Sequence, residues 1–269
     1  MTGWRFSLEA APALRVDLRG ITPGKLAGLA LADVEKLPVG HGNRLEALAE
    51  FFRIEAAVDD SLRFDGDLSR FDRIGWQMAC GRVEVNGHAG HYAGGCMSGG
   101  SLTVHGSAGL LAACEMAGGS LTIDGNVDDF AASTLPGSMD GMRGGSLIVK
   151  GDAGMRFGDR MRRGTALVFG NAGDFLASRM VAGTIAIGGS AGAHAGYGMR
   201  RGSVLFAGSA PEPSSTFVPA IASADVIWQL LARDVARHGG PFEGLAGRRI
   251  DRHLGDLAAG GKGELIFVR

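Results

Sequence analysis

A glycine recurs along the middle of the chain at a nearly fixed spacing. It follows each short apolar segment, as in VNGH, VHGS and IDGN. Successive spacings are 21, 19, 19, 26, 19, 19 and 19 residues for Gly66, Gly87, Gly106, Gly125, Gly151, Gly170, Gly189 and Gly208. The unit is therefore 19 residues, with two residues inserted in the first repeat and seven, around Thr134 to Asp140, in the fourth. A unit this short cannot bury an apolar face alone, so equivalent units have to stack.

Glycine is also unusually abundant, and the repeat explains it. There are 46 glycines among 269 residues, or 46/269 = 17 %, against about 7 % in average proteins. Apolar residues make up 45 % and charged residues 20 % of the chain, which suits a buried core better than a disordered linker. The formal net charge of −1 disfavours general nucleic-acid binding, which depends on a strong positive field.

Aligning the repeats on the glycine shows columns of similar residues. The residue two positions after it is small and apolar, and the residue directly after it is a turn former. The residues four and two positions before it are apolar, which predicts a strand with one inward face: Leu62, Val83, Leu102, Leu121, Leu147, Ala166, Ile185 and Val204, then Phe64, Val85, Val104, Ile123, Val149, Val168, Ile187 and Phe206. We therefore predict a mainly β chain folded as a right-handed, single-stranded parallel β-helix, or solenoid, of about seven to eight coils.

A methionine stands ten positions after the glycine in most repeats. Methionine is a soft metal ligand, but one methionine per coil is more typical of an inward core stack. We predict a core role for Met97, Met116, Met161, Met180 and Met199, joined by Met78 and Met142 once the insertions are removed.

The segments on either side of the repeat are expected to cap it, because an open end of the β-helix is an exposed sheet edge. We divide the chain into an N-terminal cap (residues 1–60), the β-helix (61–210) and a C-terminal part (211–269). The cap holds predicted strands from Trp4 to Leu8 and from Leu14 to Leu18, and a predicted helix from Pro23 to Leu37.

The C-terminal part begins with a linker, PEPSSTFVP, and continues into a helix and a tail. Ser223 is the predicted N-cap of this helix, which ends at Gly239-Gly240. Its predicted buried face consists of Val226, Ile227, Leu230, Leu231 and Val235.

Catalytic and metal chemistry is poorly represented. The three cysteines, Cys80, Cys96 and Cys114, form no CxxC pair, which argues against disulfides and structural zinc and favours a reducing compartment. They lie among Ala, Gly and Met, and we expect them to be small buried core residues. The one close histidine pair, His88 and His91, is expected to be structural. No carboxylate pair and no Ser/His/Asp arrangement recurs, so we expect no catalytic residue and no metal in this chain.

The N-terminal sequence MTGWRFSLEA lacks the basic start and apolar run of a signal peptide, and no stretch approaches the length of a membrane span. We expect a cytoplasmic protein that binds neither membrane nor nucleic acid.

Arginines follow the methionines in three repeats. In the repeat frame Arg143, Arg162 and Arg200 share one column, so Arg143 and Arg162 are predicted on neighbouring rungs about 5 Å apart. Like charges this close repel unless an anion lies across them. One interpretation is a solvated edge with carboxylate partners such as Asp159 or Asp174. The other is a binding strip for an acidic carrier tail or a partner subunit, formed by Arg143, Arg162, Arg163, Arg200 and Arg201.

The glycine repeats with methionine and Gly-Ser corners resemble the GxGxG β-helix shared by the C subunit of formylmethanofuran dehydrogenase and the C-terminal domain of glutamate synthase. The flanks RVDLRGITPGKLAGL, GNRLEALAEFF and RRIDRHLGDLAAGGKGELIFVR are similar to the first of these two types. That family includes archaeal tungsten or molybdenum dehydrogenases and a bacterial formyltransferase/hydrolase complex. The chain has 23 Arg and 4 Lys, 27 together, a composition that favours the bacterial complex over a hyperthermophile.

The resemblance implies a non-catalytic scaffold in one-carbon (formaldehyde) oxidation. The complex would convert formyl-tetrahydromethanopterin to formate through a methanofuran- or methylofuran-type carrier. The implied partners are a formyltransferase subunit, an amidohydrolase-like subunit and a third sister subunit, together a hetero-octamer. The resemblance places no catalytic residue and no cofactor on this chain. Two alternatives stay open: the equivalent subunit of an archaeal-type tungsten or molybdenum dehydrogenase, and an independent β-helix acyltransferase.

Overall fold

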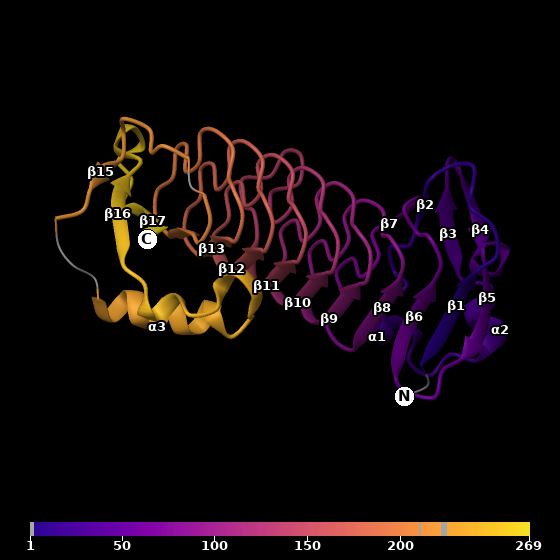
Figure 1. The fold of residues 1–269 in the computed structure, drawn as a ribbon. Helices are drawn as coiled ribbons and strands as arrows, with labels where there is room; N and C mark the ends of the chain where they lie inside the picture. The colour runs from indigo at the N-terminus through magenta and orange to yellow at the C-terminus, as the bar shows by residue number, and fades with distance from the viewer. Residues whose placement is uncertain (1–2, 210, 222–224) are drawn as a thin grey trace.

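The chain is mainly β, and a single mostly parallel sheet runs through it (Figure 1). The structure is a computed structural model and describes residues 3–209, 211–221 and 225–269. Thirteen strands form the main sheet, and those from β1 to β17 pair in parallel. In spatial order these are β1 (Trp4–Leu8), β6 (Ser61–Asp65), β8 (Arg82–Asn86), β9 (Ser98–Val104), β10 (Gly118–Ile123), β11 (Arg143–Val149), β12 (Arg163–Val168), β13 (Thr184–Ile187), β14 (Ser203–Phe206) and β17 (Gly263–Val268).

Equivalent residues of successive repeats lie opposite one another. Leu102 pairs with Leu121, and Leu121 pairs with Leu147 across the insertion. A second parallel ladder passes through the residues two positions after the repeat glycine: Leu68, Ala89, Ala108, Val127, Ala153, Ala172 and Ala191. Ala210, the last residue predicted in that column, lies outside the described residues.

The side chains directly after the repeat glycine also connect successive repeats. Asn126 Oδ1 accepts a hydrogen bond from the backbone N–H of Asp152 at 2.8 Å, and Asp152 Oδ1 accepts from Asn171 N at 2.6 Å. Ser107 and Asn171 bond to the next repeat in the same way. These residues therefore satisfy backbone donors that would otherwise face solvent at the corner.

The predicted core is confirmed. Every residue four and two positions before the repeat glycine is at most 1 % exposed. All seven methionines of the ladder are also buried, among them Met97, Met161 and Met199 at 0 %. Both sets belong to one continuous hydrophobic cluster, so the methionines pack in the interior and are not an exposed strip for metal.

The N-terminal part adds strands to one end of the main sheet and differs from the prediction in its helix. β1 matches the predicted strand, and β5 (Phe52–Ala56) pairs antiparallel on its outer side. The predicted single helix is wrong: the chain forms α1 (Pro23–Leu26) and α2 (Leu31–Glu35). Gly28, between them, adopts φ +79°, which interrupts helical backbone.

The second predicted strand is shortened to β2 (Val16–Asp17), which joins a small second sheet. The other strands of this sheet are β4 (Arg44–Ala47), β3 (Pro38–His41) and β7 (Phe71–Asp72).

The C-terminal part covers the other end of the main sheet. β17 pairs with β14, and β16 (Ile250–Gly255) and β15 (Val218–Pro219) follow in antiparallel order. Short 3-10 turns lie at Leu48–Glu50, Gly240–Phe242, Leu245–Gly247 and Leu257–Ala259. None of the helices in the described part of the chain has the length and apolar character needed to span a bilayer.

Helix α3 (Asp225–Ala236) lies against the outer face of the sheet (Figure 1). The side of the helix that contacts the sheet differs in part from the predicted one. Trp228, Ala232 and Val235 are buried against Leu167, Ala186, Leu205 and Ile266. The predicted face is therefore right for Val235 and for Leu231, which is partly buried against the same cluster, and wrong for Val226, Ile227 and Leu230, which are 74, 61 and 64 % exposed. The large indole of Trp228 selects the buried side, and Ala232 and Val235 follow it at helical spacing. The predicted N-cap Ser223 lies outside the described residues.

We predict that close approach between successive repeats, and not backbone conformation alone, requires glycine at position 145. A Cβ there would lie 2.6 Å from the Gly119 carbonyl oxygen, whereas a Cβ on Gly137 would meet nothing within 4 Å. Their φ angles are similar, +79° and +85°, so the strain of left-handed backbone is common to both. Chemical denaturation should show Gly145→Ala less stable than Gly137→Ala by about 1–3 kcal/mol. Equal losses would contradict the close-approach argument.

Candidate functional site

All five arginines of the predicted strip line one surface hollow. Its volume is about 580 Å³, and its remaining lining residues are Val181 and Ala182. No acidic residue lines it among the residues described. The five guanidinium groups come from three repeats: Arg143, Arg162, Arg163, Arg200 and Arg201.

The predicted pairing of Arg143 with Arg162 needs correction. Arg143 begins β11 and lies opposite Arg163, the first residue of β12. The register then shifts by one residue before Ser146 pairs with Thr165, which marks a β-bulge. The repeat count could not reveal this bulge, because it adds one residue to β11 without changing the spacing of the repeat glycines.

The carboxylates expected to neutralise the strip are also different. Arg162 pairs with Asp140, at 2.5 Å between Nε and Oδ1, and not with Asp159 or Asp174. Asp140 comes from the seven-residue insertion, which sequence spacing could not position. Within the described ranges, the Arg143 side chain hydrogen-bonds only to the backbone carbonyl of Glu115, at 3.5 Å. Among the described residues, no side-chain hydrogen bond or ion pair is formed by Arg163, Arg200 or Arg201.

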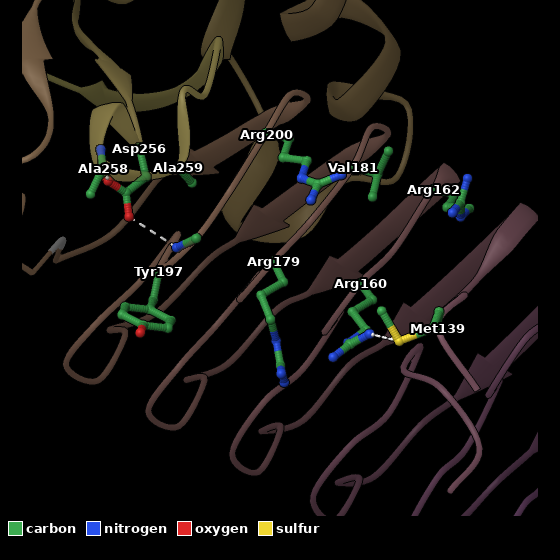
Figure 2. A pocket seen from close by; sticks show the side chains of 11 residues that line it. Met139, Arg160, Arg162, Arg179, Val181, Tyr197, Arg200, Asp256, Ala258 and Ala259 are labelled. Carbon is green, nitrogen blue, oxygen red and sulfur yellow. Dashed lines mark hydrogen bonds between the residues drawn. The ribbon is translucent and has the colours of Figure 1, made fainter. Parts of the chain in front are cut away.

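The repeat between those of Arg162 and Arg200 lacks the arginines, and its short side chains line the hollow. Val181 and Ala182 follow Met180 where Arg162 and Arg163 follow Met161. The short side chains form a floor between arginines on either side. Figure 2 shows Arg162, Val181 and Arg200 in one row along neighbouring repeats. An anion resting on this floor would meet guanidinium groups from both sides, and arginine is well suited to planar carboxylates.

A second row of arginines, which the sequence analysis missed, lies beside the first. Arg160 and Arg179 precede the methionines of the ladder and share with Arg162 and Arg200 a second hollow of about 460 Å³ (Figure 2). A signal was present, since Arg-Met occurs at 160–161 and 179–180, one repeat apart. The two hollows share Arg162, Val181 and Arg200, so they form one continuous surface, which is rich in arginine and has one acidic lining residue, Asp256, in the second hollow.

Arg179 is held by a buried carboxylate. Asp159 is 3 % exposed and accepts hydrogen bonds from Arg179 Nη2 at 2.9 Å and from the Ser178 hydroxyl. Arg160 is less well satisfied: its Nε is 3.8 Å from Asp159, and its Nη1 donates to the Met139 thioether. A thioether is a weak acceptor, so Arg160 keeps most of its capacity to bind an anion.

The two histidines of the close pair, His88 and His91, are structural acceptors, as expected. His88 Nδ1 accepts from Ser107 N, and His91 Nδ1 accepts from Leu110 N, both at 3.0 Å. Burial, together with the nearby Arg15 charge, lowers the pKa of His91, which keeps the ring neutral for this role. In the described part of the chain, no three His, Cys, Asp or Glu residues are grouped to hold a metal ion.

The cysteines only partly follow the expectation of burial. Cys114 is buried, Cys96 is half-buried and Cys80 is exposed. Burial raises the pKa of the Cys96 and Cys114 thiols, and for Cys96 the Glu115 carboxylate raises it further. Cys80 lies two residues after Met78 and is exposed at the surface, so the prediction of a core role is wrong for this cysteine.

Comparison with known proteins identifies close relatives. The chain matches a chain of the crystal structure of the formyltransferase/hydrolase complex (FhcABCD) from Methylorubrum extorquens in complex with methylofuran. The TM-score is 0.91 and the sequence identity 39 %, over 98 % of both chains. A scan against protein-family models finds no match.

Curated sequences match over shorter segments. The C subunit of the formyltransferase/hydrolase complex Fhc of Methylorubrum extorquens is 43 % identical over 76 residues, 28 % of this chain and 29 % of that protein. The C subunit of molybdenum-containing formylmethanofuran dehydrogenase 1 of Methanosarcina barkeri is 34 % identical over 82 residues, 29 % of this chain and 27 % of that protein. The matched segment thus spans less than a third of these curated relatives.

We predict that the three cysteines of the folded protein alkylate in order of exposure. Treatment with iodoacetamide near pH 8 should modify Cys80 at least about tenfold faster than Cys114, because the buried thiol is neutral and inaccessible. Peptide mass spectrometry measures each rate. In urea the three rates should converge. Rapid modification of Cys114 in the folded protein would contradict the packing described.

Proposed function

Because the chain belongs to the family formed by the C subunits of formyltransferase/hydrolase and formylmethanofuran dehydrogenase complexes, we propose that it is a non-catalytic scaffold subunit of a formyltransferase/hydrolase complex. The 39 % identity and 98 % coverage to a chain of that complex are the observation that carries the proposal. The complex would convert formyl-tetrahydromethanopterin to formate through a methylofuran-type carrier, in one-carbon oxidation. Its other members would be a formyltransferase, an amidohydrolase-like subunit and a third sister subunit, in a cytoplasmic hetero-octamer.

The repeat architecture suits a scaffold. We infer that residues 61–210 form a right-handed, single-stranded parallel β-helix, with residues 1–60 and 211–269 as its caps. The in-register parallel pairing at two positions of each repeat supports this inference, and parallel crossover connections are almost always right-handed. Such a rod presents a long rigid surface on which neighbouring subunits can be held at fixed positions.

Helix α3 provides a surface for one of these subunits. Val226, Ile227 and Leu230 form an exposed apolar stripe on the side facing away from the sheet. Exposed apolar patches on a folded protein are typical of protein–protein contacts.

The double variant Val226→Ser/Leu230→Ser should lose its partners without losing its fold. Purification of the tagged chain from its native cells, followed by mass spectrometry, should recover a formyltransferase and an amidohydrolase-like chain with the wild type. We expect at least about a tenfold lower yield of partners with the variant, since apolar contact area is removed. The control Arg233→Ser changes an exposed residue of the same helix and should keep them.

Recovery of the wild-type chain alone would contradict the scaffold proposal. Equal recovery with wild type and the α3 variant would contradict only the role of this helix. Thermal unfolding of the variant should stay close to that of the wild type, because the two side chains are largely exposed.

For the arginine-lined surface we propose a binding role toward the acidic tail of the carrier or toward a partner subunit. Its support is the hollow itself, which five arginines line with no acidic lining residue among those described. Arginines kept this close are electrostatically unfavourable unless an anion shields them.

The double variant Arg162→Ala/Arg200→Ala should weaken carrier binding to the assembled complex at least about tenfold, equivalent to about 1.4 kcal/mol, or should disrupt assembly. Isothermal titration calorimetry with the carrier and native mass spectrometry of the complex measure these two effects. The control Arg53→Ala/Arg237→Ala removes the same charge at exposed positions away from the hollow. If carrier affinity and assembly both stay at wild-type levels, the proposed role of the strip is wrong.

A further inference from the structure

The seven-residue insertion of the fourth repeat lies on the arginine-lined surface. Two adjacent residues of it make the contacts. Asp140 forms the ion pair with Arg162, and Met139 receives the hydrogen bond from Arg160 Nη1. Figure 2 shows Met139 beside Arg160 at the edge of the hollow. The insertion therefore contacts one arginine in each of the two rows.

The insertion also closes a recess behind Arg160. This recess has a volume of about 280 Å³ and is lined by residues 134–138 of the insertion together with Leu111, Phe130, Ser133, Asp159, Arg160 and Arg179. Arg160 and Arg179 line the outer hollow as well. The two spaces thus share both arginines, and movement of the insertion would join them.

The recess contains unused hydrogen-bonding capacity. The Ser133 residue is 1 % exposed, and its Oγ is buried without a hydrogen-bond partner among the described residues. Asp159 is already occupied by Ser178 and Arg179. Since Asp159 balances one of the two arginines, the group Asp159, Arg160 and Arg179 carries one positive charge that no other described carboxylate neutralises at short range.

The contacts made by the insertion are the kind that a ligand can replace. Met139 is 67 % exposed, and its thioether is a weaker acceptor for a guanidinium than a carboxylate is. The Asp140–Arg162 pair is also partly exposed, at 37 and 46 % of the two side chains. Exposed ion pairs contribute little to stability. Replacing Asp140 by a carboxylate of a ligand should therefore change the free energy of the Arg162 ion pair very little.

We propose that the insertion 134–140 is a displaceable lid on the arginine-lined surface. In the free protein Met139 and Asp140 occupy Arg160 and Arg162; when a chain of carboxylates binds, its carboxylates take these two positions. The inference rests on the proposed anion-binding role of the surface and adds what regulates it. The ligand class is a small polycarboxylate, because the hollows are of small-molecule size and carry planar, carboxylate-binding cations at several positions.

The test measures binding of a tetraglutamate peptide to the assembled complex by calorimetry. Asp140→Asn combined with Met139→Ala removes both internal occupants, and the affinity should rise about threefold to tenfold. Asp128→Asn is the charge-matched control: Asp128 is an exposed carboxylate of the same repeat that lines none of these hollows. It should leave the affinity within about twofold of wild type.

A third variant tests the lid in the opposite direction. Met139→Glu places a carboxylate beside Arg160, so the lid should hold more tightly and tetraglutamate affinity should fall at least about fivefold. Thermal unfolding of each variant verifies that it is folded, and all the substituted residues are at the surface or half-buried.

The outcomes separate this inference from the proposal on which it rests. If Arg162→Ala/Arg200→Ala weakens tetraglutamate binding but the variants at 139 and 140 leave it unchanged, the surface binds anions and the lid does not exist. If the wild-type complex binds no tetraglutamate, the lid and the binding of an acidic tail are both wrong, and only the proposed contact with a partner subunit is left for the arginines.

Discussion

Hydrogen bonding between the backbones of successive repeats is the constraint on which the rest of the structure depends. It requires equivalent residues to lie opposite one another, as Leu102, Leu121 and Leu147 do. Whatever a column contains is therefore repeated along the rod: apolar residues produce a continuous core, and the side chains after the repeat glycine produce a ladder that satisfies backbone donors. The arginine-lined surface has the same origin, since an arginine near the corner of one repeat is brought beside its counterparts.

This constraint explains which parts of the fold could be predicted. Strand positions, the inward columns and the methionine core follow from a 19-residue period and were correct wherever the structure describes them. Local departures from the period could not be predicted from the sequence. The bulge that places Arg143 opposite Arg163 depends on backbone conformation near Gly144 and Gly145, and the position of Asp140 depends on how the insertion folds back. Of the candidate site, the grouping of the five strip arginines could therefore be predicted, whereas their partners and the second row, Arg160 and Arg179, were missed.

The surface that α3 covers could have been predicted from the repeats, although not from the sequence of the helix. The outward residue three positions before the repeat glycine is polar in the early repeats, with Arg63, Glu84, Thr103 and Thr122, and apolar in the later ones. The helix covers the later ones, packing on Leu167, Ala186 and Leu205. Hydrophobic periodicity within α3 is ambiguous because apolar residues occur on two of its sides. The apolar sheet surface of the later repeats decides which side of α3 is buried. Helical spacing alone could not predict that side.

The presence of apolar residues on two sides of α3 also bears on function. A helix with one apolar side against its own sheet and another exposed can connect the sheet to a neighbouring protein without unfolding. The arginine-lined surface shows a similar division for charge. Buried Asp159 accepts hydrogen bonds from Arg179 and lies 3.8 Å from Arg160, whereas Asp140 and Met139 of the insertion contact Arg162 and Arg160 from the surface. Because stacking of the repeats fixes the backbone of all three arginines, the proposed lid would place any regulation of this surface in the insertion 134–140, which departs from the 19-residue repeat.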